Sequence, residues 1–170
     1  MKFIHLISKI LLISIIATIC TDLWSLILYF GFERQIHWGL PGRWFGHFLQ
    51  GELIFNIPTS TPILYEEILG WIFHYLVGLL FTIGYYITFI RLFKKTPQWY
   101  TALLFSWLMM IFPFLALQPA MGVGVAAHLA PNPWLNRFVT ISAHTIFGLG
   151  LYLGYYLYSK LEKKYSNGGS

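Results

Sequence analysis

Long apolar runs, separated by shorter polar stretches, dominate this chain. Four of them are each long enough to cross about 30 Å of hydrocarbon as a helix. The four runs lie near residues 6–30, 69–91, 99–118 and 138–158. The segments that connect them are 31–68, 92–98 and 119–137. This pattern predicts an all-α integral membrane four-helix bundle, a single membrane domain over residues 1–170, with a structured loop at 31–68 and a kink at Pro113.

Composition and charge agree with a membrane protein. Only 10% of the residues are charged, against about 25% in soluble domains, so no soluble domain is expected. The net charge of +5 comes from basic residues at the predicted helix ends, which places both termini and segment 92–98 on the cytoplasmic side. Basicity therefore indicates topology, and a nucleic acid partner is not expected. These basic residues are Lys2, Lys9, Arg91, Lys94, Lys95, Lys160, Lys163 and Lys164.

One segment occurs twice, 70 residues apart. Residues 74–86 read HYLVGLLFTIGYY and residues 144–156 read HTIFGLGLYLGYY. The repeat predicts two parallel helices, each closing an outward–inward hairpin, as in some transport folds. We interpret its glycines as positions of close helix approach, and its tyrosine pairs as an aromatic belt at the inner interface. The matched positions are His74/His144, Gly78/Gly148, Leu79/Leu149, Gly84/Gly154, Tyr85/Tyr155 and Tyr86/Tyr156.

Three ionisable residues fall inside the predicted spans, where such groups are costly and usually functional. At 1.5 Å per residue, His74 lies roughly 8 Å and His144 roughly 9–10 Å below the outer ends of their helices, and Asp22 roughly 12 Å. We predict that Asp22, His74 and His144 form one polar site in the outer half of the bilayer. Such a site suits an acid–base relay or a zinc or iron ion. A purely structural Asp22–histidine pair is the alternative.

Further polar residues are expected around the outer mouth of this site. Glu67 lies seven residues before His74, and Arg137 seven before His144, so each pair shares a helix face. Arginines beside a histidine suit a phosphate or carboxylate headgroup. The candidates from the outer segments are Arg43, His47, Gln118 and His128.

Several motifs along the chain resemble DUF2938, a bacterial family of multipass membrane proteins of unknown function. The resemblance implies the bacterial cytoplasmic membrane and no particular activity. It singles out Asp22, Arg43, His47, His74, Gln118 and His144, and leaves His128 outside its pattern. The motifs are TDLW at 21–24, GRWFGH at 42–47, GWIFHY at 70–75, PF at 113–114, QP at 118–119, GVGVAA at 122–127 and HTIFGLGLY at 144–152.

The leading hypothesis is a site that binds a small or lipid-borne polar group. Three alternatives are open: an enzyme acting on a lipid headgroup, a proton-coupled carrier, and a structural or assembly subunit. The sequence identifies no cofactor and leaves a bound metal open. Membrane lipid and a second copy of the chain are the expected partners.

Overall fold

The regular structure of the described residues is entirely helical in this computed structural model, which covers residues 2–32, 38–54 and 56–167. Residues 33–37 and 55, inside the predicted loop 31–68, lie outside the described residues. The α-helices are α1 (Lys2–Phe32), α2 (Gly39–Leu49), α3 (Glu66–Tyr85), α4 (Trp99–Leu108), α5 (Gln118–Ala120) and α6 (Pro133–Asn167). Two π-helical segments, η2 (Tyr86–Leu92) and η3 (Pro113–Leu117), and two 3-10 turns, η1 (Ile57–Thr59) and η4 (Val125–Ala127), complete them.

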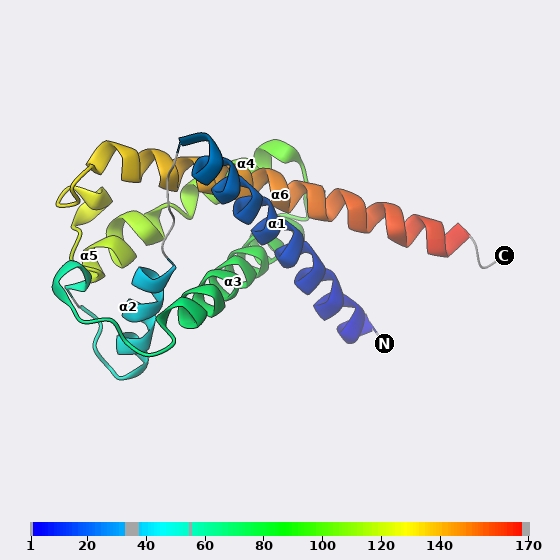
Figure 1. The fold of residues 1–170 in the computed structure, drawn as a ribbon. Helices are drawn as coiled ribbons and strands as arrows, with labels where there is room; N and C mark the ends of the chain where they lie inside the picture. Colours follow the sequence, from blue (N-terminus) through cyan, green and yellow to red (C-terminus); the bar gives the residue numbers. More distant parts are fainter. Residues whose placement is uncertain (1, 33–37, 55, 168–170) are drawn as a thin grey trace.

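Four stretches are long and apolar enough to cross a membrane, judged by length and composition. This confirms the predicted all-α fold with four spans. Both chain termini lie at one end of the molecule, and α2 and α5 lie at the other end (Figure 1). The four spans are Ile4–Gly31, Glu66–Leu92, Trp99–Ala120 and Pro133–Lys164.

Besides α1, which begins at Lys2 instead of 6, two helices begin earlier than predicted. α3 begins at Glu66 instead of 69, and α6 begins at Pro133 instead of 138. Asn132 explains the second case, because its side-chain oxygen accepts the Leu135 N–H at 3.2 Å, as a helix cap does. Pro133 then suits the first turn, where no N–H is needed. The predicted loop 119–137 is thus shorter than expected, and Arg137 belongs to a helix.

The third span is broken close to the predicted kink at Pro113. After α4 ends at Leu108, the Met110 N–H donates to the Trp107 carbonyl and the Phe112 N–H to the Met109 carbonyl, both at 3.1 Å, which tightens the helix. From Pro113 to Leu117 the chain widens into η3. Proline cannot donate a helical hydrogen bond, and π-helical turns occur frequently at functional sites.

The repeated glycines lie at helix crossings, as expected for close packing. A Cβ at Gly78 of α3 would overlap the Thr18 side chain of α1. A Cβ at Gly148 of α6 would come within 3.0 Å of Ser106 in α4, and one at Gly154 within 3.1 Å of Ile13 in α1. α6 therefore packs against both α1 and α4, while α3 packs against α1.

The prediction that the tyrosine pairs form an aromatic belt is wrong for their first members. Tyr85 is 0% exposed and Tyr155 5% exposed, and their ring centroids lie 5.6 Å apart in the core. The Tyr85 hydroxyl is hydrogen-bonded to Thr101 Oγ1 at 2.8 Å. The Tyr155 hydroxyl is buried with no partner among the described residues. Packing of α3 near α6 thus brings repeat-equivalent tyrosines together in the interior.

These two hydroxyls should respond differently to removal. Tyr85→Phe should lower stability by about 1 kcal/mol, because it breaks a buried hydrogen bond and leaves the ring in place. Tyr155→Phe should be neutral or slightly stabilising, because it removes a buried polar atom that has no partner. Melting of the two purified variants in the same detergent measures the difference. An equal loss in both variants would contradict this assignment.

Candidate functional site

Asp22 joins α1 to α3 through two hydrogen bonds. His74 Nε2 lies 2.8 Å from Asp22 Oδ1, and the Tyr75 hydroxyl donates to Asp22 Oδ2 at 2.8 Å. Because an ionised carboxylate only accepts hydrogen bonds, the imidazole proton must sit on Nε2. The pair is partly exposed: the side chains of His74 and Asp22 are 17% and 19% exposed.

Aromatic rings surround this pair. The Trp38 ring centroid lies 4.1 Å from that of His74. The Trp71 ring lies 5.5 Å from Trp38, 5.9 Å from His74 and 6.4 Å from Tyr75. We call Asp22, Trp38, Trp71, His74 and Tyr75 the Asp22 cluster. Among the described residues, His74 Nδ1 has no hydrogen-bond partner.

His144 takes part in a different group of contacts. Its Nδ1 lies 2.9 Å from the Thr140 carbonyl oxygen, which can only accept, so the proton is on Nδ1. Its ring lies 6.0 Å from Phe81. Within the described part of the chain, no hydrogen bond or ring contact links His144 to Asp22 or His74. In the same residues, no three His, Cys, Asp or Glu side chains are grouped so as to hold a metal.

Thr140 links Gln118 to His144, because both side chains are hydrogen-bonded to it. The Thr140 hydroxyl donates to the Asn136 carbonyl at 2.9 Å, so toward Gln118 it can only accept. Gln118 Nε2 donates to that hydroxyl at 3.3 Å, and Gln118 Oε1 is buried with no partner in the described chain. Gln118 and His144 thus form a second polar group, next to the π-helical segment η3.

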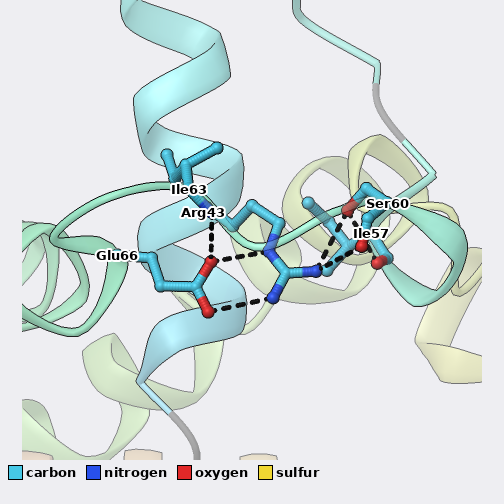
Figure 2. A network of polar contacts seen from close by, with 5 residues as sticks. All are labelled: Arg43, Ile57, Ser60, Ile63 and Glu66. Atoms are coloured by element: carbon cyan, nitrogen blue, oxygen red, sulfur yellow. Dashed lines mark hydrogen bonds and ion pairs between the residues drawn. The ribbon is translucent and has the colours of Figure 1, made fainter.

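Arg43, a candidate anion contact, is held by Glu66. Its Nε and Nη2 donate to the two Glu66 oxygens at 2.7 and 2.9 Å, and Nη1 donates to the Ser60 carbonyl at 2.7 Å (Figure 2). The Ile63 N–H donates to Glu66 Oε2 at 3.0 Å. Hydrogen bonding to Glu66 raises the pKa of Arg43 above its ordinary value, so the guanidinium stays charged. Arg43 is only 7% exposed, and it fastens α2 to the start of α3.

The other outer candidates are each held locally. Glu67 Oε1 lies against Gly39, 2.8 Å from where a Cβ would stand, in the first turn of α2, where free N–H groups favour a carboxylate. Arg137 Nε donates to the Ala126 carbonyl at 2.9 Å, with its guanidinium 4.7 Å from the Trp134 ring centre. His47 Nδ1 lies 2.7 Å from Glu52, and His128 Nδ1 lies 3.2 Å from the Val125 carbonyl. No ion pair joins Glu67 to Arg137 in the portion described.

Sequence reasoning missed two functional candidates, Glu66 and Tyr75. Glu66 adjoins the predicted site residue Glu67, and Tyr75 adjoins the predicted site residue His74. The only signal for Tyr75 was its place in the GWIFHY motif. For Glu66 the signal was a neighbouring pair of carboxylates, and the sequence does not distinguish which member faces Arg43.

The two halves of the repeat differ chemically. Tyr75 donates to Asp22, whereas its repeat equivalent, Thr145, accepts the Trp107 indole N–H at 3.0 Å. The Ser106 hydroxyl donates to the His144 backbone carbonyl. The described contacts of the second half therefore include no carboxylate beside the histidine, and the acidic site belongs to the first half.

Comparison with known proteins places the chain in a family. No curated protein and no solved structure matches the chain. The family model described as a protein of unknown function, DUF2938, matches residues 11–158, which is most of the chain. The chain therefore belongs to the DUF2938 family.

Proposed function

We propose that this multipass membrane protein binds a small or lipid-borne polar group at the Asp22 cluster. The observation that carries the proposal is the Asp22 carboxylate, hydrogen-bonded to His74 and Tyr75 between two spans and still partly exposed. An ionisable pair within a span is costly and therefore points to function. Nδ1 of His74, which has no hydrogen-bond partner among the described residues, supplies a further contact for a bound group.

The proposed site belongs to the outer half of the bilayer of a bacterial cytoplasmic membrane, with both termini cytoplasmic. Asp22 is ten residues from the end of α1 and His74 eight from the start of α3, which are depths of roughly 15 and 12 Å. The lysines of the terminal segments support this orientation, because both termini lie at the end away from α2 (Figure 1). We propose membrane lipid, and a second copy of the chain, as partners.

Histidine–carboxylate pairs commonly hold and release a proton in enzymes and carriers. A lipid-headgroup enzyme would need this capacity for acid–base catalysis. A proton-coupled carrier would need it to link proton movement to its cargo. Both roles require first that a polar group binds, so binding is the step to test.

A structural role is the second candidate, since Asp22 also ties α1 to α3. In that case, the hydrogen bonds would serve only to fix how the two helices pack. This role predicts a loss of stability without the loss of any bound molecule.

Replacing the central pair should empty the site. Purified Asp22→Asn and His74→Gln proteins should retain a co-purifying polar molecule or lipid about 10–100-fold less than the unmodified chain, because each loses a charged hydrogen bond. Native mass spectrometry of the intact protein measures the retained species. Glu162→Gln, in an exposed ion pair near the C-terminal end of α6, is the matched control. Unchanged retention with a lowered melting temperature would instead favour the structural role.

A further inference from the structure

Among Asp22, His74 and Tyr75, the hydrogen-bonding positions left open are all acceptors. The Tyr75 hydroxyl proton and the His74 Nε2 proton both point to the Asp22 carboxylate. Within the described residues, each Asp22 oxygen keeps a free lone pair, and Nδ1 of a neutral His74 is an acceptor as well. The open positions on Asp22 and His74 therefore accept hydrogen bonds and suit a donor. The donors left in the cluster are the Trp38 and Trp71 indole N–H groups, which have no hydrogen-bond partner among the described residues.

The charges that described residues bring near the cluster favour a cation. Asp22 carries a negative charge, and Glu67, two helical turns before His74, has no ion pair in the described chain. The basic residue that α2 brings to this end is Arg43. Its charge is neutralised by Glu66, and its Nη1 donates to the Ser60 carbonyl. Arg137 is held by the Ala126 carbonyl and the Trp134 ring. A phosphate or carboxylate would thus meet acceptors and negative charge at Asp22.

Aromatic rings complete a site of this kind. Trp38 and Trp71, with centroids 5.5 Å apart, lie beside His74, and Tyr75 adds a third ring. Electron-rich ring faces attract cations within about 6 Å, and aromatic cages recognise ammonium groups in this way. Trp71 is 42% exposed, so one side of the cluster can be reached from outside the protein.

We infer that the group bound at the Asp22 cluster is a primary ammonium. The inference rests on the proposed function and specifies its ligand. Asp22 supplies the opposite charge, His74 Nδ1 and the free carboxylate lone pairs accept its N–H groups, and Trp38 and Trp71 face its positive charge. A primary ammonium occurs both on phosphatidylethanolamine headgroups and on small free amines.

The test uses the full chain in nanodiscs made from equal parts of phosphatidylethanolamine, phosphatidylcholine and phosphatidylglycerol. After transfer to detergent, native mass spectrometry should detect phosphatidylethanolamine retained about tenfold over the other two lipids. Phosphatidylcholine carries a cation without N–H donors, and phosphatidylglycerol carries no cation. Asp22→Asn should abolish the preference, and Trp71→Leu should reduce it about three- to tenfold. Glu162→Gln should leave it unchanged.

A second arm separates the two sources of the ammonium. Ethanolamine added to delipidated protein should raise the melting temperature in an Asp22-dependent way if the free amine suffices, and should have no effect if the lipid is required. Because Trp71 is half exposed, Trp71→Leu keeps the test valid even if Asp22→Asn fails to fold.

Two results would overturn the inference. Equal retention of all three lipids together with no Asp22-dependent response to ethanolamine would exclude an ammonium ligand. Asp22-dependent retention of phosphatidylglycerol would do the same, while leaving the proposed polar site in place. The proposed function itself fails only if no co-purifying species depends on Asp22 or His74.

Discussion

Gly42→Ala is expected to loosen α2 from α3 and to lower the melting temperature by roughly 6–12 °C. A Cβ at this position would overlap two backbone atoms of α3, the Glu66 carbonyl oxygen and the Gly70 nitrogen. Backbone atoms cannot turn aside as a side chain can, so the helices must separate. Overpacking of this kind costs about 3 kcal/mol. Trp38 directly precedes α2, so its contact with His74 should weaken as well.

The melting temperature in detergent, measured beside a matched glycine variant, checks this expectation. Gly31→Ala is the control, because a Cβ at Gly31 would meet no atom within 4 Å. Gly70→Ala should behave like Gly42→Ala, since its Cβ would overlap the Trp38 carbonyl oxygen. If Gly42→Ala melts together with Gly31→Ala, the close crossing of α2 and α3 is not present in the protein.

The membrane spans could be predicted because the thickness of a bilayer sets the length of a spanning helix. Apolar runs of that length mark all four spans, and Pro113 marks the break in the third. Helix starts were less predictable. The early start of α6 depends on one cap, the Asn132 side chain, which lies before the apolar run begins.

The arrangement of α2 could not be predicted, because it depends on contacts between residues far apart in the chain. Whether Glu66 or Glu67 faces Arg43 is decided by the rotation of α3 about its axis, and neighbouring residues on a helix point about 100° apart. The proximity of Trp38 to His74, 4.1 Å between ring centroids, depends on the same packing. An apolar pattern defines the face of a helix more coarsely than this.

The repeat indicated two related helices, but it could not indicate how their histidines are bonded. His74 finds a carboxylate on another helix, whereas His144 bonds the carbonyl one turn earlier on its own helix. Both choices are open to a histidine at either position, and the neighbouring helix decides between them. α1 offers Asp22 to His74, while the described contacts of α4 offer His144 no carboxylate.

Arg43→Gln is expected to be the most destabilising polar substitution among the outer residues. It leaves Glu66 with a largely buried and unpaired charge, since the two side chains are 9% and 17% exposed. Removing one partner of a buried ion pair costs about 3–5 kcal/mol. Arg43→Lys should restore little, because an ammonium cannot match the two-point contact with Glu66 or reach Ser60 with the same geometry. The melting temperature in detergent gives the size of each loss.

The double variant Arg43→Gln with Glu66→Gln separates the ion pair from the helix contact itself. It should recover part of the stability that either single change loses, because no unpaired charge is then left behind. Glu52→Gln is the surface control: its side chain is 54% exposed in its pair with His47, and exposed pairs contribute about 0–1 kcal/mol. Equal losses of stability from Glu52→Gln and Arg43→Gln would contradict a stabilising buried ion pair between α2 and α3. If the buried pair joins the two helices, the loss should be confined to Arg43 and Glu66. In the described chain Arg43 joins α2 to Ser60 and to Glu66 at the start of α3, and Glu66 also accepts the Ile63 N–H.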